Sequence, residues 1–403
     1  MRLSMKILIF SEMFPKPNAP SSGIFVKKRL EYLLKEKRMD FDFAPISTFD
    51  TSLISFVKRL KKIPRIELTD FLEVEHKKFK VFQVPLKTVT RYEMIKGKTK
   101  AWIKYAEEMM KTLEQNFKVS DYNLIHAHRA FPEGHAAFLL SEKYKIPYIV
   151  TSHGSEIHSA ENDFLKLIID ILENSSKAIF VSEYLRKDAI KKGYSGRKSV
   201  VIPNGIDTDI FKPVDKTKAR KKLNIYQKDY KYVGFVGNLI PIKRADKLPE
   251  IFHDISRSIP NIHFIVVGDG YLKRDIEKRT KDLQITFTGR IKPERVPIYM
   301  NAMDVMILPS RNEGWPCVVL EAQACGVPVV GSSNGGIPEA IGDNDMIVTE
   351  GPNFENRFAK RVIYVLKNSV SPNKLRRRAV KFSWKSMVRR EIEIYCEVAN
   401  FRF

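Results

Sequence analysis

Short apolar runs recur along the chain, and segments with helical spacing of apolar positions follow many of them. Met5–Phe10 (MKILIF) is the first such run, and its length is typical of a buried strand. A loop with three prolines and Gly23 comes next, and Phe25, Leu30 and Leu33 then fall on one face of a predicted helix. Strand, loop and helix in this order are typical of doubly wound α/β domains, in which ligands gather at the carboxyl ends of the strands.

The same alternation continues to the end of the chain. Strands are predicted at 41–45, 123–128, 146–151, 178–182, 232–237, 261–268, 285–289, 305–309 and 327–330, and long helices at 96–117 and 382–395. The segment 51–66 is amphipathic, which suits either a surface helix over the core or a helix lying on an anionic membrane. Because 403 residues exceed one ordinary core, we expect two domains of about 200 residues.

The stretch 309–341 combines a turn, a short helix, a strand and a glycine-rich loop. The turn is N-E-G-W-P (312–316), and the predicted helix covers 317–324 and ends at Gly326 and Pro328. The polar loop 332–336 follows the strand. A helix that begins after such a turn presents unpaired backbone N–H groups, which suit an anion such as a diphosphate.

Two glutamates in this stretch stand eight positions apart. Glu313 lies in the turn, and Glu321 is expected about two helical turns further on. Carboxylates at these places would accept hydrogen bonds from hydroxyls at the two ends of a sugar nucleotide. For two glutamates considered alone, plain solvent exposure is the commoner explanation, since charged side chains usually lie in water.

The complete string E-G-W-P-C-V-V-L-E-A-Q-A-C-G-V-P-V-V, followed by S-N-G-G-I-P-E-A, closely resembles the Glu-x7-Glu signature and the G-G-x-P-E loop of the retaining GT-B glycosyltransferases, in particular glycosyltransferase family 4. Segments similar to other parts of that family follow in order: S-G-I-F-V-K, N-L-I-H-A-H, H-G-S-E, I-P-N-G-I-D and V-G-D-G. The resemblance implies a GT-B fold of the α/β class, with two facing doubly wound (Rossmann-like) domains and an interdomain cleft. It implies an acceptor-side domain at 1–205, a nucleotide-sugar domain at 206–380 and a helix at 381–403 that crosses back to the first domain.

The resemblance also implies a reaction. A hexosyl or N-acetylhexosaminyl group would pass from a nucleoside-diphosphate sugar, of UDP or GDP type, to an acceptor hydroxyl with retention, without a metal or other cofactor. Glu313 would bond the donor sugar's hydroxyls, Lys243 would stabilise the departing diphosphate, and His153 would contact the sugar near its reacting end. Glu321 would hold the ribose. The other donor-binding positions would be Gly23, Gly237, Asn238, Arg290, Gly314, Trp315, Pro316, Cys317, Gly335 and Gly336.

The chain departs from the family at one functional position. In the family, an arginine and a lysine five positions apart clasp the donor diphosphate, and their charge offsets the charge that grows on the leaving group. Here Lys243 is present, but Asn238 occupies the arginine position. Arg244 stands where a small residue is usual, and it either supplies the missing catalytic charge or is a solvated surface cation.

The charge balance favours an anionic partner. Seventy Lys and Arg oppose 47 Asp and Glu, which gives a formal net charge of +23. With the resemblance, this favours a glycan or lipid-linked acceptor at an anionic membrane surface, and a step in cell-surface polysaccharide or glycoconjugate assembly. We therefore expect a cytoplasmic protein, peripheral at the inner face of the plasma membrane. Its three cysteines have no disulfide or metal spacing, and its apolar runs are too short for a signal peptide or a membrane span.

Other functions remain open at this point. A soluble transferase acting on a sugar phosphate, inositol phosphate or malate would share every donor-side motif. A nucleic-acid-binding protein would need aromatic residues interleaved with basic ones in a recognisable module, which is absent from the sequence. A Rossmann oxidoreductase would need G-x-G-x-x-G after the first strand. Metal binding by His126, His128, His153 and His158 is a weaker alternative, because no short ligand pair with a carboxylate stands out.

Overall fold

The chain divides into two structural units. The computed structural model describes residues 5–16, 22–36, 39–50, 70–86, 93–94, 98–158 and 160–401. The first unit comprises Met1–Pro203 and Met387–Phe403, and the second comprises Asn204–Ser386. The boundaries expected from the sequence lay after residues 205 and 380.

The first unit is built on a parallel seven-stranded sheet in the order β5-β2-β1-β6-β7-β8-β9. Its strands are β1 (Met5–Ser11), β2 (Met39–Asp50), β5 (Phe82–Leu86), β6 (Leu124–His128), β7 (Tyr148–Ser152), β8 (Lys177–Phe180) and β9 (Ser199–Val201). Every residue of β6 and β7 is buried, as expected for parallel strands that helices cover on both faces. An antiparallel hairpin, β3 (Phe71–Val74) and β4 (Lys77–Lys80), packs Phe79 against Phe43 of β2 and was not predicted.

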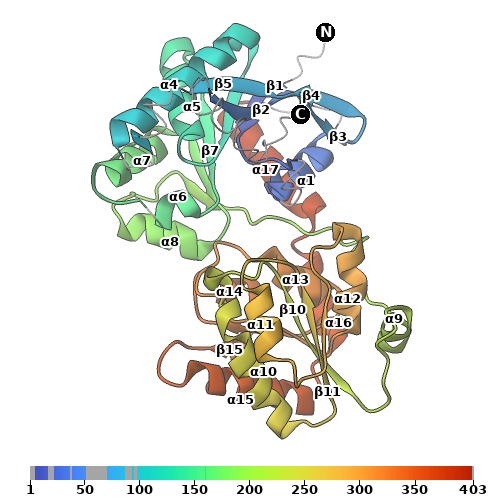
Figure 1. Ribbon diagram of the computed structural model, residues 1–403. Coiled ribbons are helices and arrows are strands. Elements are labelled where there is room, and N and C mark those ends of the chain that lie inside the picture. Colours follow the sequence, from blue (N-terminus) through green and yellow to red (C-terminus); the bar gives the residue numbers. More distant parts are fainter. Residues whose placement is uncertain are drawn as a thin grey trace, which may run out of the picture. The chain divides into compact units, whose positions relative to one another are not determined.

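Helices cover the two faces of this sheet. They are α1 (Ile24–Leu33), α4 (Thr99–Asn116), α5 (Glu133–Tyr144), α6 (Ser155–His158), α7 (Asn162–Asn174) and α8 (Glu183–Lys191). Figure 1 shows α4, α5 and α7 grouped together, and α1 beside the last helix, α17 (Trp384–Val398). This division follows from right-handed crossovers, because α1 leads from β1 to one side of the sheet and α5 leads from β6 to the other.

The second unit repeats this plan with six parallel strands in the order β12-β11-β10-β13-β14-β15. The strands are β10 (Lys231–Val236), β11 (Ile262–Val267), β12 (Ile285–Phe287), β13 (Val305–Leu308), β14 (Val329–Ser332) and β15 (Ile347–Val348). The helices are α9 (Lys216–Lys222), α10 (Leu248–Ser258), α11 (Lys273–Arg279), α12 (Val296–Ala302), α13 (Cys317–Ala324), α14 (Ile337–Ile341), α15 (Phe354–Lys367) and α16 (Pro372–Val380). Figure 1 shows these helices surrounding the sheet.

The structure confirms the predicted α/β class and most predicted elements. The helix predicted at 317–324 is α13, and the helices predicted at 96–117 and 382–395 correspond to α4 and α17 with shifted ends. The amphipathic segment 51–66 lies outside the described residues. Among the helices that the structure describes, none is long and apolar enough to cross a membrane.

Candidate active site

The order of strands in the second unit identifies where a ligand would bind. From β10 the chain builds the sheet outwards through β11 and β12, and from β13 it builds in the opposite direction through β14 and β15. β10 and β13 are neighbours, so the loops that follow them leave the sheet at the point where the direction reverses. In open α/β sheets, ligands bind at the carboxyl ends of the strands at this switch point.

Lys243 and Glu313 meet at the switch point. Lys243 ends the short helical turn Pro241–Lys243 after β10, and Glu313 lies in the turn after β13. Lys243 Nζ lies 2.5 Å from Glu313 Oε1, and Ser310 Oγ donates to the same oxygen at 3.0 Å. The side chains are 25% and 12% exposed, so the pair is largely shielded but still reachable from solvent. A cation and a carboxylate from two loops distant in sequence therefore lie side by side at the switch point.

The glycine-rich loop after β14 packs directly on the Glu313 turn. Gly336 donates its backbone N–H to the Glu313 carbonyl at 2.7 Å. Gly335 has φ +61°, and a Cβ there would lie 2.2 Å from the same carbonyl oxygen and 2.8 Å from Asn312 Oδ1. Only glycine combines this left-handed backbone with such a close approach. The G-G pair therefore fixes the turn that presents Glu313.

Helix α13 begins at Cys317, and Pro316 occupies the preceding cap position. The prediction that Glu321 lies about two turns into the helix was wrong, because 313–316 are not helical and Glu321 is only the fifth residue of α13. Its side chain is half-buried, and burial raises the pKa of this carboxyl to about 7. Such a group lacks good solvation in the absence of a ligand, which suits a hydroxyl-binding role.

Trp315 faces the interior of the unit. It is 7% exposed, its Nε1 donates to the Asn204 carbonyl at 3.1 Å, and its ring lies 5.5 Å from the ring of Phe382. Trp315 therefore anchors the turn on the segment that begins the second unit. Gly314, beside it, continues the same turn and is half-buried.

Arg244 follows Lys243 but points elsewhere. Its backbone is left-handed, with φ 53°, and its guanidinium bonds both carboxylate oxygens of Glu350, at 2.7 and 2.9 Å. The same guanidinium stacks on the ring of Phe354 at 3.9 Å. Its side chain is 8% exposed, so its charge is neutralised inside the unit. In this arrangement Arg244 does not stand in for the arginine that Asn238 replaces.

The remaining predicted positions lie along the same edge of the sheet. Gly237 and Asn238 follow β10, and Asn238 is exposed. Gly237 lies close to Gly268, which follows β11, because a Cβ on Gly268 would lie 1.9 Å from the Gly237 carbonyl oxygen. Arg290 is exposed and follows β12. Because β12 is the edge strand two places from β10, these two strands are roughly 10 Å apart across the sheet.

His153 and Gly23 belong to the first unit. His153 follows β7; its Nε2 lies 3.3 Å from His128 Nδ1, and its ring lies 4.6 Å from that of Phe25. Its Nδ1 is buried without a hydrogen-bond partner among the described residues. Gly23 caps the start of α1 with φ 58°, and a Cβ there would lie 2.3 Å from the Met13 carbonyl carbon. Its position is therefore that of a helix-start glycine.

Known protein families match both units of the chain. Residues 75–210 match the family described as Glycosyltransferase Family 4, and residues 215–382 match Glycosyl transferases group 1. A putative teichuronic acid biosynthesis glycosyltransferase of Bacillus subtilis is 30% identical over 354 residues, covering 85% of both chains. The chain belongs to glycosyltransferase family 4. An uncharacterized glycosyltransferase of Methanocaldococcus jannaschii is 28% identical, covering 86% of this chain and 93% of the relative.

Solved structures show that this family 4 glycosyltransferase has the GT-B fold. Sucrose-phosphate synthase from Thermosynechococcus elongatus superposes with a TM-score of 0.74 at 21% identity, covering 98% of this chain and 99% of the other. HepE of Anabaena, in a complex with UDP, superposes with a TM-score of 0.71 at 17% identity, covering 98% and 100%. At these identities, the likeness extends to the fold alone.

The residue that ties the two switch-point loops of the glycosyltransferase together, Arg311, was not predicted from the sequence. Arg311 bonds both oxygens of Asp246, at 2.7 and 2.8 Å, and its backbone N–H donates to the Ile242 carbonyl at 2.8 Å. The ion pair holds the pKa of the Asp246 carboxyl below its usual value. No local pattern signals a pair that spans 65 positions.

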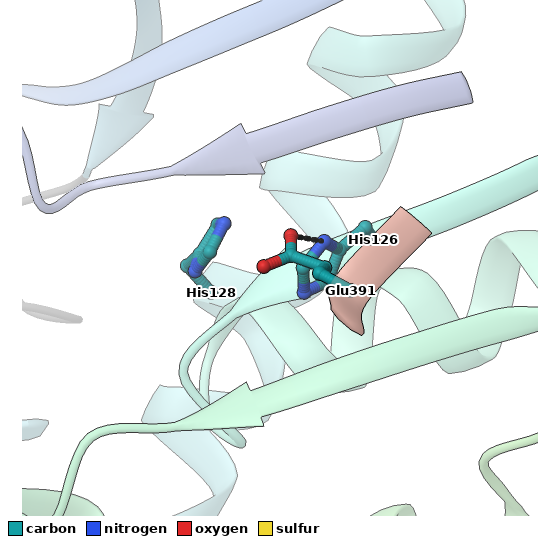
Figure 2. Close-up of side chains that lie close together, drawn as sticks. All are labelled: His126, His128 and Glu391. Atoms are coloured by element: carbon teal, nitrogen blue, oxygen red, sulfur yellow. Dashed lines mark ion pairs between the residues drawn. The ribbon is translucent and has the colours of Figure 1, made fainter. Parts of the chain in front are cut away.

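A second cluster lies inside the first unit, where α17 reaches β6; the sequence had indicated its two histidines as a weaker metal-binding alternative, but not Glu391. One nitrogen each of His126 and His128 and one oxygen of Glu391 all lie within 4.8 Å of one another, the spacing of a possible metal site (Figure 2). However, Glu391 is already paired with the buried Arg29. Both ring nitrogens of His126 are engaged, by the hydroxyls of Tyr395 and Thr151. A divalent cation would add uncompensated charge beside Arg29, so these residues fit a metal poorly.

Proposed function

We propose that this glycosyltransferase moves a hexosyl or N-acetylhexosaminyl group from a nucleoside-diphosphate sugar to an acceptor hydroxyl, with retention of the anomeric configuration. The observation that carries the proposal is the contact between Lys243 and Glu313 at the switch point of the second unit. It combines a cation for a diphosphate with an acceptor for sugar hydroxyls, on loops that glycines and ion pairs hold in place. The donor would be of UDP or GDP type.

Each residue has a proposed role in this reaction. Lys243 neutralises the charge that develops on the leaving diphosphate, which a preorganised cation in a shielded site does more effectively than water. The first backbone N–H groups of α13 and the Gly335–Gly336 loop assist it. Glu313 orients the donor sugar, Glu321 accepts hydrogen bonds from the ribose, and His153 contacts the sugar near its reacting carbon. No metal takes part in this scheme.

The described residues offer no strong candidate for a covalent nucleophile. Retention would then follow from attack by the acceptor on the face that the diphosphate leaves, with the diphosphate oxygens taking the acceptor's proton. The new bond joins the acceptor oxygen to the anomeric carbon as the bond from that carbon to the phosphate oxygen breaks. NMR spectroscopy of the product's anomeric proton tests the stereochemistry, and an inverted product contradicts the scheme.

For the acceptor, we propose a lipid-linked glycan precursor in cell-surface polysaccharide or glycoconjugate assembly. The support is the net charge of +23, which favours an anionic membrane, and a relative named for teichuronic acid biosynthesis. The protein would then work at the inner face of the plasma membrane. Co-sedimentation with anionic liposomes at low salt tests this part, and equal recovery with neutral liposomes contradicts it.

A small soluble acceptor is the second candidate, and one comparison favours it. A D-inositol 3-phosphate glycosyltransferase of Segniliparus rotundus is 25% identical over 291 residues, covering 66% of this chain. An acceptor phosphate would suit the basic chain equally well. Parallel assays with a polyprenyl-diphosphate-linked sugar and with inositol phosphate distinguish the two candidates.

The donor experiment is a panel of nucleotide sugars tested for thermal stabilisation and for hydrolysis. Glu313→Ala should abolish the response to the correct donor. Lys247→Ala is a control, because Lys247 lies near the Lys243–Glu313 pair in sequence but bonds Glu250 instead, at 2.9 Å. A panel in which no nucleotide sugar stabilises the protein overturns the proposed function.

A further inference from the structure

The C-terminal helix carries a polar cluster into the core of the first unit. Glu391 and Tyr395 of α17 are both fully buried, as are Arg29 of α1 and His126 of β6. Glu391 pairs with Arg29 through one carboxylate oxygen and accepts the Tyr395 hydroxyl through the other. Figure 2 shows the Glu391 carboxylate directed towards the histidines of β6.

For a neutral His126, whose pKa burial holds well below its ordinary value, the hydrogen bonds in this cluster leave one arrangement of protons. Glu391 pairs with Arg29, and its other carboxylate oxygen accepts the O–H that Tyr395 donates. The Tyr395 oxygen then accepts from His126 Nδ1–H, which lies 2.7 Å away. His126 Nε2 is left as the acceptor of the Thr151 hydroxyl at 2.8 Å. The helix therefore determines which nitrogen of His126 carries the proton.

His126 is linked in turn to His153 by two routes. Thr151, which it bonds, stands two residues before His153 at the end of β7. The ring of His126 also packs 4.4 Å from the ring of His128, and His128 Nδ1 lies 3.3 Å from His153 Nε2. Burial, with the nearby charge of Arg29, holds the pKa of all three histidines well below the ordinary value. His126, His128 and His153 thus form a row of neutral imidazoles.

We propose that Glu391 and Tyr395 are positioning residues for His153, acting through His126, so that the C-terminal helix sets the histidine that contacts substrate. This inference rests on the proposed function, which gives His153 that contact. Glu391 and Tyr395 do not touch the substrate themselves.

A purely structural role explains this cluster less well. A buried ion pair rarely stabilises a core more than apolar side chains of similar volume. Among the described residues, His128 Nε2 and His153 Nδ1 are also buried without hydrogen-bond partners, and a buried unpaired polar atom destabilises the fold. An arrangement that carries such costs fits a role in fixing one orientation of the histidines.

Tyr395→Phe is the test, since it removes one oxygen and keeps the volume. Other contacts still hold α17, because Arg390 Nη2 bonds the Val201 carbonyl at 2.8 Å and Lys177 pairs with Glu397 at 2.7 Å. Tyr122→Phe is the matched control. Tyr122 is also buried in the first unit, and it lies just before β6. Its hydroxyl donates to Asp42 at 2.7 Å, away from the histidines.

Two measurements are made on each variant. Two-bond ¹H–¹⁵N correlation spectra of protein labelled at histidine distinguish protonated from bare ring nitrogens, and the His153 signals are identified by their loss in His153→Gln. Steady-state transfer gives kcat and KM. We expect Tyr395→Phe to change the His126 and His153 signals and to lower kcat about 10- to 100-fold, the cost of displacing a contact group. Tyr122→Phe should change neither quantity.

A double variant, Arg29→Met with Glu391→Leu, separates positioning from folding. It replaces the ion pair by apolar groups, so the melting temperature should be kept or raised while kcat falls. The proposal is overturned if, in Tyr395→Phe, the His153 signals stay unchanged and kcat stays within twofold of the parent value. If the parent enzyme transfers no sugar, the proposed function fails, and the His153 signals alone still decide whether the helix positions this ring.

Discussion

Lys243 and Glu313 are 70 positions apart in sequence and 2.5 Å apart at their charged atoms. One follows β10 and the other follows β13, and these strands are neighbours although β11 and β12 separate them along the chain. The crossover that places β13 beside β10 therefore creates the pair. The contact cannot form unless the sheet reverses its direction of growth at this point.

Replacing Lys243 should harm catalysis more than folding. Lys243→Ala is expected to lower kcat by about 10²- to 10³-fold, the usual effect of removing one preorganised group that stabilises transition-state charge. Lys247→Ala, measured beside it, should stay within about twofold of the parent because its partner Glu250 lies on the surface. Equal losses in both variants would assign the effect to the general loss of positive charge.

The pKa of Glu321 predicts opposite pH trends for stability and donor binding. Its pKa is raised to about 7 in the folded protein from an ordinary 4.5, so folding stabilises the protonated form, and this contribution is lost as pH rises through about 7. Glu321→Gln should therefore raise the melting temperature relative to the parent at about pH 8 but not at about pH 4. Scanning calorimetry across this range checks the sign.

Donor affinity should follow the reverse trend, because the ionised carboxylate is the better acceptor for ribose hydroxyls. Between about pH 6 and about pH 8, a nucleotide sugar should bind the parent more tightly as pH rises and should bind Glu321→Gln with little change. A sugar diphosphate diester is the proper probe, since its phosphates keep their charge over this range. A parallel pH trend in both proteins would contradict the role of Glu321.

Local pattern was sufficient to predict the parts of the site that lie within one continuous segment. The turn, helix and glycine loop of 309–341 carry Glu313, Glu321, Gly335 and Gly336, and the breaks at Pro316 and Gly326 set the bounds of α13. The position of Glu321 was misjudged because counting turns from Glu313 assumed a helix where the chain is a turn. A fixed spacing gives the distance along a helix only after the helix start is known.

Contacts between distant segments were beyond sequence reasoning. Arg311 pairs with Asp246, and Arg244 pairs with Glu350, 106 positions away. Sequence gives each charge but not its partner, because the partner depends on which loops the sheet order brings together. The cluster of Arg29, His126 and Glu391 was missed for the same reason, since it joins both ends of the first unit.

Gly335 should be irreplaceable for activity. Gly335→Ala meets the Glu313 carbonyl at 2.2 Å and must also hold φ +61°, so the Glu313 turn has to shift. The backbone strain alone costs about 1–2 kcal/mol. Gly193→Ala is the matched control, because Gly193 also has positive φ but has no atom within 4 Å of an added Cβ. Both variants should melt at lower temperature, but only Gly335→Ala should lose transfer activity; similar activities would disprove the close fit.

Arg244 should matter for folding rather than for donor binding. Although burial acts in the opposite direction, bonds from Arg244 and Asn334 lower the pKa of the Glu350 carboxyl. Arg244→Met keeps contact with Phe354 but leaves Glu350 with only Asn334, so we expect a lower melting temperature and an unchanged donor KM. A donor KM that rises about 10-fold or more would instead assign Arg244 to the diphosphate.

Asn238 offers the opposite experiment, a gain of function. It occupies the position at which the family carries an arginine, directly after β10, and it is exposed, so a longer side chain meets little steric hindrance. Asn238→Arg should add a charge-assisted bond to the diphosphate, lowering the donor KM by about 5- to 30-fold for a gain of roughly 1–2 kcal/mol. Asn238→Gln, of similar reach but neutral, should leave KM near the parent value, and Asn238→Glu should raise it.

If Asn238→Arg lowers KM only when Lys243 is intact, the two cations act on one diphosphate. If it lowers KM equally in Lys243→Ala, the two cations act independently. No change in either background would place the diphosphate away from the end of β10.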